Sequence, residues 1–280
     1  RDRLRSRGLG DVYKRQLLMK VVERHEKEAW ICMYIKRWLK TPFITKDGQL
    51  IERKSGTPQG GVISPVLANM FLHYVFDMWM KRNFPQAPFE RYVDDGIIHC
   101  QTKEEAVFIK ENLAKRFAEC KLELHSVKTR IVYCKDKDRT RKEELSEFDF
   151  LGYTFKAVYI KCRDGKVRYN FIASVSKTSS KRFQDKIKSM EIHKSTGCKI
   201  DIIAEMLNPL IRGWMNYFGK FNLSAMRRTL QCIERKLIKW AMCKYKNFRG
   251  RRHRTEKWLC TVRQREPKMF AHWSNLYSYC

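Results

Sequence analysis

The stretch FERYVDDGIIHC, residues 89–100, is the part of the chain that most strongly indicates its fold and chemistry. Strand-forming residues flank two adjacent aspartates, and aspartate is disfavoured in strands but common in turns. The pattern predicts two strands, Phe89–Tyr92 and Gly96–Cys100, joined by Val93-Asp94-Asp95. We therefore expect an antiparallel hairpin that carries two carboxylates at its tip.

Two acidic side chains at one turn have a simple explanation and a chemical one. The simple explanation is a hairpin turn that needs only polar residues. Adjacent carboxylates repel each other, however, and a divalent cation offsets that repulsion. Two-metal nucleotidyl transfer uses carboxylates that hold two Mg²⁺ ions roughly 4 Å apart, and oxygen-only ligands suit Mg²⁺. Asp94 and Asp95 are therefore candidate metal ligands, with Mg²⁺ as the expected cofactor.

The charge of the chain points to a polyanionic partner. Lysine and arginine number 59 against 30 acidic residues, a formal net charge of +29. Repulsion among these charges opposes folding, and a polyanionic partner would offset it. The simpler explanation of the positive charge is that it keeps the protein soluble. Nucleic acid fits better than a membrane, because no basic amphipathic helix has a clean apolar face and no apolar run approaches the roughly 20 residues that span a bilayer. Cysteines without C-x-x-C spacing give little support to a zinc or redox site.

Helices and strands alternate in the first two thirds of the chain. Apolar residues at helical spacing from Leu17 predict one helix that ends before Pro42, and Asp47-Gly48 predicts a hairpin. The loop SGTPQGG at 55–61 precedes a hydrophobic helix that begins at Ser64-Pro65. The elements predicted here are helices at 17–41, 64–80 and 103–121, and strands at 43–46, 49–53, 130–134 and 148–155.

After about Ser174 only helical patterns remain. They lie at 181–190, 200–221, 225–246 and 255–264. Asn208-Pro209 is typical of a cap and a first helical turn, which leaves open whether the second of these is two helices. The order of elements predicts an α+β fold in which a partial palm with an antiparallel sheet precedes an all-α domain, with a boundary near 170–178.

Several segments, taken with Tyr92-Val93-Asp94-Asp95, resemble the reverse transcriptases of bacterial group II introns in the same order. They are SGTPQGGVISPVLAN (55–69), LELHSVKT (122–129), FDFLGY (148–153), LNPLIRGWMNYF (207–218) and MFAHW (269–273). The resemblance runs from Leu17 to Trp273. It implies a reverse transcriptase palm at 17–172 and an α-helical thumb or maturase-specific domain at 173–280.

The resemblance also implies roles for matching residues. Asp94 and Asp95 would bind the metal, Lys128 would act at the triphosphate, and Leu151 and Gly152 would form the primer grip. The nucleotide pocket would be lined by Pro58, Gln59, Gly60 and Tyr92. Primer or intron RNA would be bound by Arg212, Arg227, Arg228, Arg251 and Arg252. Each role has a simpler alternative. The loop with Pro58, Gln59 and Gly60 could be a helix-capping turn, Gly152 could be a purely structural glycine, and Lys128 and the arginines could be merely solvated.

The segment before Leu17 departs from the resemblance. The family carries a further catalytic aspartate on a palm strand, but its position falls near Arg5, while Asp11 falls near a later aspartate. Residues 1–16 are either a flexible arm that touches nucleic acid or a non-native junction, and the abrupt start of the resemblance favours the junction. We expect an N-terminally truncated palm without fingers, and no endonuclease domain, because no Cys/His-rich module follows His272-Trp273.

The resemblance implies an RNA-directed DNA polymerase, a nucleotidyltransferase, that is also the maturase of a mobile group II intron. Its partners would be intron RNA, an RNA template with a DNA primer, and dNTPs. We expect polymerisation by this polypeptide to be impaired. The alternatives are an RNA-binding splicing cofactor without polymerase activity, or a non-functional fragment. We expect a bacterial cytoplasmic location, associated with nucleoid or ribonucleoprotein, and the sequence leaves a homodimer open.

Overall fold

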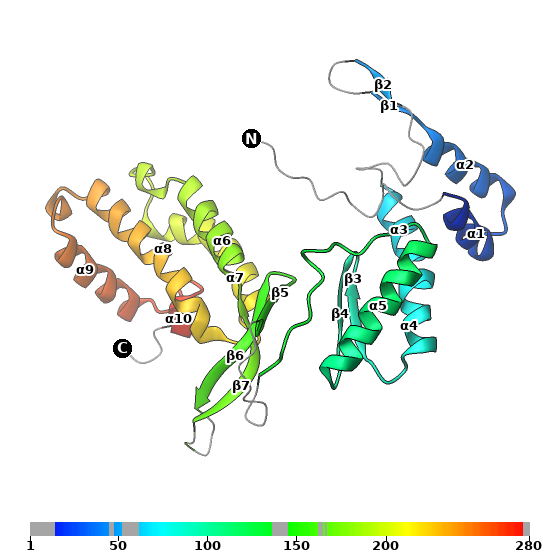
Figure 1. The fold of residues 1–280 in the computed structure, drawn as a ribbon. Coiled ribbons are helices and arrows are strands. Elements are labelled where there is room, and N and C mark those ends of the chain that lie inside the picture. The colour runs from blue at the N-terminus through cyan, green and yellow to red at the C-terminus, as the bar shows by residue number, and fades with distance from the viewer. Residues whose placement is uncertain are drawn as a thin grey trace. The chain divides into compact units, whose positions relative to one another are not determined.

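The computed structural model describes residues 15–44, 48–51, 62–135, 145–161, 165 and 167–276. The chain folds into two compact units, Arg1–Ile131 and Val132–Cys280. Helices dominate both units in Figure 1, and every strand pairing among the described residues is antiparallel. The predicted α+β class, with helices in the C-terminal part, is confirmed.

The N-terminal unit begins with two helices where the sequence predicted one. They are α1 (Arg15–His25) and α2 (Ala29–Lys40). Residues 23–28 contain no apolar side chain, so the stripe that would bury a continuous helix is interrupted. The Glu26 carboxylate accepts a hydrogen bond from the Glu28 amide (2.9 Å), which replaces a helical bond at the break. The prediction of one helix was therefore wrong at this point.

A short hairpin and a long helical run follow. The hairpin pairs β1 (Phe43–Ile44) with β2 (Leu50–Ile51), and Gly48, shortly before β2, has φ +78°, a conformation that glycine adopts without strain. The run contains α3 (Ser64–Leu72), the π-helical η2 (His73–Asp77) and α4 (Met78–Asn83). The helix predicted at 64–80 is thus present, with a π-helical segment inside it. Such segments are rare and frequently lie at functional sites.

Aromatic packing holds the hairpin β3 (Phe89–Tyr92) and β4 (Asp95–Ile98) against these helices. The Phe76 ring, in η2, packs edge-on against Phe89 at 5.1 Å and against Phe117 of α5 (Lys103–Glu119) at 6.4 Å between ring centroids. Figure 1 shows α5 alongside the two strands. Phe76 therefore lies between the hairpin and α5 and packs against both.

A three-stranded sheet opens the C-terminal unit. Its strands are β5 (Glu147–Phe150), β6 (Tyr153–Lys161) and β7 (Val167–Val175), in the order β5-β6-β7. The strand predicted at 130–134 is wrong, because those residues have no strand assignment. One backbone bond is made there, from the Tyr133 amide to the Leu145 carbonyl (2.9 Å). A single bond does not make a ladder.

The rest of this unit is helical. Its helices are α6 (Lys177–Ser189), α7 (Ile200–Phe218), α8 (Leu223–Lys244), α9 (Arg252–Arg265) and α10 (Trp273–Leu276), with short 3₁₀ turns η3 (Ile192–Lys194) and η4 (Lys246–Phe248). Side-chain caps begin two of them, because Ser176 accepts from the Ser179 amide and Asn222 from the Ala225 amide. Their apolar faces bury a common core around Trp240.

Helix α7 passes through Pro209 without a break, which decides the alternative that the sequence left open. Asn208 does not cap a new helix. Its amide nitrogen donates to the Met269 carbonyl (2.8 Å), and its amide oxygen accepts from the Ala271 amide (2.8 Å). Asn208 therefore fastens the segment before α10 onto the middle of α7.

The compact units divide between Ile131 and Val132, whereas the predicted palm extends to residue 172. Strand β7 continues through residues 172 and 173. Helix α1 begins at Arg15, inside the segment predicted as non-native or disordered. No helix among the described residues is both long and apolar enough to span a bilayer.

Candidate active site

The two aspartates lie at the tip of a two-residue hairpin. Tyr92 of β3 stands opposite Asp95 of β4, so the loop consists of Val93 and Asp94 alone. Asp95 begins a strand here, whereas the sequence predicted it in the loop. Val93 has φ +56° and Asp94 does not have a positive φ. That combination is typical of a type II′ turn, which normally has glycine at the position of Val93 and matches the twist of the strands.

The tip presents its acidic groups to solvent. Tyr92, Asp94 and Asp95 are all exposed. Among the described residues neither carboxylate has a hydrogen-bond or ion-pair partner, so both are available to a ligand. Adjacent, unpaired carboxylates supply the oxygen ligands that Mg²⁺ prefers. No cluster of three or more metal-ligating side chains occurs in the described part of the chain, so the pair lacks a third protein ligand there.

Arg91, at the residue before Tyr92, connects the hairpin to the helical run. Its guanidinium forms a two-pronged ion pair with Asp77 of η2, with Nε–Oδ1 at 2.6 Å and Nη2–Oδ2 at 2.7 Å. Its Nη1 donates to Asn69 Oδ1 of α3 (2.9 Å) and to the Val93 carbonyl (2.8 Å). The Arg91 and Asp77 side chains are only 13% and 16% exposed.

Sequence reasoning missed these three residues as a group. Two signals were present in the chain. Asp77 is an isolated acid within the hydrophobic run 71–80, and Arg91 immediately precedes the Tyr-x-Asp-Asp string. A charge in an apolar run calls for a partner. Neither signal identifies that partner, because the two side chains come from different elements.

The predicted nucleotide-pocket and triphosphate residues are described only in part. Pro58, Gln59 and Gly60 lie outside the described residues. Tyr92 is exposed beside the aspartates. Lys128 is exposed in a turn at 126–128, where its amide donates to His125 Nδ1 (3.4 Å). The Thr129 amide also donates to the His125 carbonyl (2.9 Å), so the backbone of this turn is held without the lysine side chain.

The predicted primer-grip residues form a second two-residue hairpin, in the C-terminal unit. Leu151 (φ +50°) and Gly152 (φ +82°) connect Phe150 to Tyr153, and two positive φ values are typical of a type I′ turn. The Gly152 carbonyl accepts from the Ser176 amide and from Ser179 Oγ, both at 3.0 Å.

Helix α7 holds the same turn from its C-terminal end. Tyr217 OH donates to the Leu151 carbonyl (3.0 Å), and the Tyr153 hydroxyl donates to the Tyr217 carbonyl. Burial raises the pKa of Tyr153, with a smaller contribution from Tyr217, so Tyr153 stays a neutral donor at neutral pH. Trp214 and Phe218 of α7 are buried in the core, whereas the Tyr217 side chain is half exposed.

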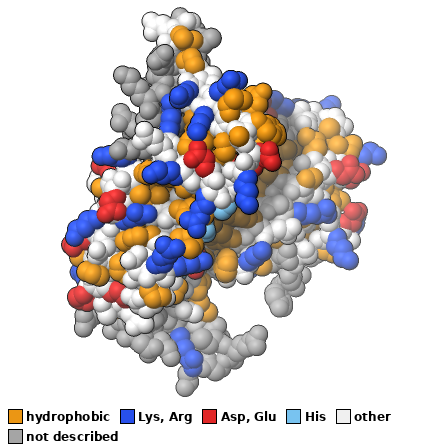
Figure 2. All heavy atoms as spheres, turned by 90° about the vertical axis from the view of Figure 1, so that its right-hand side faces the viewer, with side chains coloured by type: hydrophobic (Ala, Val, Ile, Leu, Met, Phe, Trp, Pro, Cys, Tyr) orange, Lys and Arg blue, Asp and Glu red, His pale blue; other side chains and the backbone are white. Residues whose placement is uncertain are grey.

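The predicted RNA-binding arginines lie on the surface of the helical unit. They are Arg212 of α7, Arg227 and Arg228 of α8, Arg251 before α9 and Arg252 at its start, and all five are exposed. Arg252 also pairs with Glu256 (2.8 Å). Figure 2 faces the side on which α1 to α5 lie in Figure 1, and on that face Lys and Arg side chains lie among apolar groups, with fewer acidic ones.

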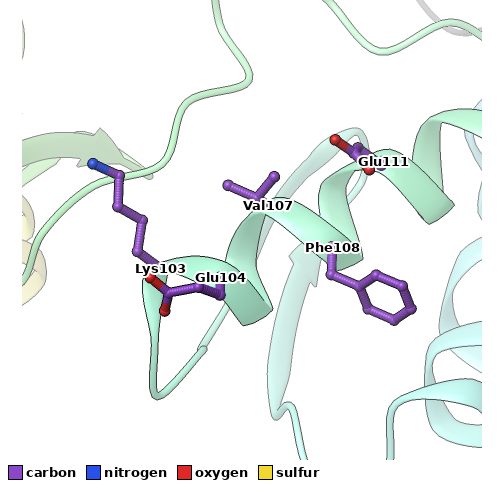
Figure 3. A pocket seen from close by; sticks show the side chains of 5 residues that line it. All are labelled: Lys103, Glu104, Val107, Phe108 and Glu111. Atoms are coloured by element: carbon purple, nitrogen blue, oxygen red, sulfur yellow. The ribbon is translucent and has the colours of Figure 1, made fainter.

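An open hollow on α5 is separate from these residues. It is lined by Lys103, Glu104, Val107, Phe108 and Glu111 (Figure 3). Val107 and Phe108 point to different sides of the helix in that view. None of the predicted site residues is part of this lining, so the hollow adds nothing to the candidate site.

Two family models match the chain. Residues 17–155 match "Reverse transcriptase (RNA-dependent DNA polymerase)", and residues 180–258 match "Group II intron, maturase-specific domain". A comparison with curated proteins gave no match. The first model contains the Asp94-Asp95 hairpin and the Gly152 turn, and the second contains α7, α8 and the start of α9. With both domains in this order over most of its length, the chain belongs to the group II intron reverse transcriptase/maturase family, whose enzymes are RNA-directed DNA polymerases.

Proposed function

We propose that Asp94 and Asp95 bind Mg²⁺ for RNA-templated DNA synthesis from a DNA primer. One observation carries the proposal: two adjacent, exposed carboxylates without partners among the described residues form the tip of a hairpin inside a reverse transcriptase domain. The metal would activate the primer 3′-hydroxyl and stabilise the leaving pyrophosphate. The two carboxylates would hold and orient it.

The other polymerase roles belong to the same proposal. Pro58, Gln59, Gly60 and Tyr92 would contact the incoming dNTP. Lys128, which is exposed, would neutralise charge on the triphosphate or donate a proton to it. Leu151 and Gly152 would position the primer strand, and the support for this role is the rigid backbone of their turn, held by hydrogen bonds from both sides.

A third carboxylate would be needed for full activity. The described residues offer only the pair, and the family position of the further aspartate falls near Arg5. We therefore infer that residues 1–280 extend primers weakly. An arginine at a metal-ligand position would repel the cation rather than bind it.

Primer extension on an RNA template with Mg²⁺ tests the polymerase proposal. We expect weak extension that Asp94→Asn abolishes. Asp185→Asn is the matched control, because Asp185 is an exposed aspartate in α6, far along the chain. Extension that survives Asp94→Asn would refute the metal role, and vigorous extension by the unaltered chain would refute the expected impairment.

Metal binding provides a measurement that does not depend on activity. Mn²⁺ shares the preference of Mg²⁺ for oxygen ligands and has an EPR signal that is lost on binding. We expect Asp94→Asn or Asp95→Asn to weaken Mn²⁺ binding by at least tenfold. Equal Mn²⁺ affinity of Asp94→Asn and Asp185→Asn would contradict the proposal.

We also propose that the helical part, residues 173–280, binds group II intron RNA and promotes splicing. The support is the maturase-specific match and the five exposed arginines, of which four lie on α7, α8 and α9 and Arg251 immediately precedes α9. This activity would remain if the chain does not polymerise. The proposed palm, residues 17–172, would end inside β7 and contain β5 and β6, although these strands belong to the same compact unit as the helices. The expected location is the bacterial cytoplasm, with the intron ribonucleoprotein.

Filter binding to a group II intron RNA across a salt series tests the RNA proposal. Each phosphate contact contributes about −0.7 to −0.9 to the slope of log affinity against log salt. The double variant Arg227→Gln, Arg228→Gln should reduce the slope by about one to two and weaken binding. Lys188→Gln, on α6, is the control. Absence of binding at low salt would refute the proposal.

A further inference from the structure

The Tyr-Val-Asp-Asp turn contains a residue type that its backbone does not favour. Val93 has φ +56°, in the left-handed region. A β-branched side chain there is a genuine outlier, and such a conformation persists only where the surroundings enforce it. Glycine is the usual residue at this position of the turn. Some contact other than the backbone bonds between the two strands must therefore stabilise the turn.

Arg91 makes that contact. Its Nη1 donates to the Val93 carbonyl at 2.8 Å, which holds the peptide between Val93 and Asp94. The same nitrogen donates to Asn69 Oδ1 at 2.9 Å. One guanidinium group thus binds the loop and helix α3 together.

Asp77 fixes the guanidinium in return. The two-pronged pair holds the plane of the group, because both carboxylate oxygens are engaged at 2.6 and 2.7 Å. Both side chains are largely buried, so water does not compete strongly for these bonds. His73 adds a contact from Nδ1 to Asp77 Oδ2 (3.2 Å). The support for the turn therefore extends into the π-helical segment.

The geometry points to a positioning role for Arg91: through the Val93 carbonyl it holds the turn that aims Asp94 and Asp95 at the metal. This inference rests on the proposed metal role of the two aspartates. Arg91 binds no substrate in it. It acts through the backbone, and Asp77 and Asn69 fix its orientation.

A purely structural role for the ion pair gives different expectations. An ion pair that only stabilises the fold would affect unfolding and leave the turn as it is. The charge of Arg91 would by itself repel a cation, so its loss would then strengthen metal binding. A positioning role predicts the opposite result, namely weaker metal binding when the contact to the turn is lost.

The decisive variant is Arg91→Lys in the full chain. Lysine keeps the positive charge and can still pair with Asp77, but it lacks the planar fork that reaches two further acceptors. We expect Mn²⁺ affinity, measured by EPR, to fall about tenfold, which is the effect usual for a group that orients a metal ligand. Asn69→Ala, which removes only one partner of Nη1, should lower the affinity less.

Arg116→Lys is the matched control. Arg116 of α5 is also partly buried and also donates to a backbone carbonyl in η2, that of Val75 (3.4 Å). It should leave Mn²⁺ affinity unchanged. Thermal unfolding of both lysine variants shows whether either has lost its fold.

Relief of backbone strain provides a further test. Glycine adopts positive φ without a penalty, so Val93→Gly should make the turn less dependent on Arg91. We expect Arg91→Lys with Val93→Gly to bind Mn²⁺ more tightly than Arg91→Lys alone. Additive effects of the two substitutions would contradict a coupling through the turn.

Hydrogen exchange at the amides of residues 93–95 separates this inference from the proposed metal role. Exchange should be about tenfold faster in Arg91→Lys than in Arg116→Lys, with no metal present. Unchanged exchange together with unchanged Mn²⁺ affinity would overturn the positioning role. A different pair of results would overturn the metal role of the aspartates instead. Exchange would be faster in Arg91→Lys, and Asp94→Asn would bind Mn²⁺ as tightly as the unaltered chain.

Discussion

Replacing Gly152 with alanine should destabilise the C-terminal unit for two separate reasons. Gly152 has φ +82°, where a side chain is strained. A Cβ on this residue would lie 2.8 Å from Ser179 Oγ and 3.4 Å from the Phe218 ring. Real Cβ atoms do not approach an oxygen so closely, so the Ser179 hydroxyl must move and release the Gly152 carbonyl.

The size of the effect follows from these two causes. A left-handed conformation costs an L-residue about 1–2 kcal/mol. Loss of the hydrogen bond from Ser179 adds about 1 kcal/mol. We expect Gly152→Ala to lower the free energy of unfolding by about 2–3 kcal/mol, which corresponds to a fall in Tm of roughly 5–10 °C for a unit of this size.

Calorimetry of the full chain, with two controls and a double variant, separates the causes. Gly250→Ala is the backbone control, because Gly250 has φ +70° and a Cβ on it would have no neighbour within 4 Å among the described residues. It should cost about 1–2 kcal/mol. Gly197→Ala, with ordinary φ and open space, should cost far less.

The double variant with Ser179→Ala gives the refuting result. In Gly152→Ala with Ser179→Ala the close contact is gone, so the combined loss should be smaller than the sum of the single losses. Strict additivity, or a Gly152→Ala chain as stable as the unaltered one, would show that the tight packing of this turn is not what restricts residue 152 to glycine.

Three further outcomes follow from buried polar groups. Asn208→Ala removes both hydrogen bonds to the segment before α10 and should lower the free energy of unfolding, measured by urea titration, by about 2 kcal/mol. Asn216→Ala, at an exposed position of the same helix, should have little effect. Equal effects of the two substitutions would contradict a stabilising role of the Asn208 hydrogen bonds. The Glu234 carboxylate is hydrogen-bonded to the buried ring nitrogens His272 Nε2 and Trp273 Nε1. Glu234→Ala leaves both nitrogens unpaired, whereas Glu234→Gln keeps an acceptor, so limited proteolysis near residues 265–276 should be faster in the alanine variant. Burial raises the pKa of the Cys232 thiol to about 11, so iodoacetamide at pH 8 should modify Cys232 far more slowly than the exposed Cys243. Because the unfolded thiol ionises first, the stability that Cys232 contributes is complete below about pH 9 and is lost as pH rises towards 11; rapid labelling of Cys232 in the folded chain would contradict this.

Local patterns predicted much of the fold. The hairpins around Gly48 and Asp94, and the helices after Ser174, were predicted because turn residues and helical spacing act over a few neighbouring residues. The errors arose where a pattern was weak. Six residues without an apolar side chain ended α1, and the stretch at 130–134 made one bond rather than a ladder.

The candidate site shows the same division. The aspartate pair, the glycine at the second turn and the basic surface could be identified from residue types alone. Arg91 could not, because its role depends on Asn69 and Asp77, which are 22 and 14 residues away along the chain. Such partners meet only after the helical run and the hairpin have packed together.

The sequence by itself determined the two adjacent carboxylates, the large positive charge, and the order of the two domains along the chain. Only the tertiary structure decided how the Gly152 turn and the segment before α10 are held. Tyr217 reaches Leu151 across 66 residues, and Asn208 reaches Ala271 across 63. A hydrogen bond between distant residues depends on the packing of whole helices, and no short stretch of sequence contains that information.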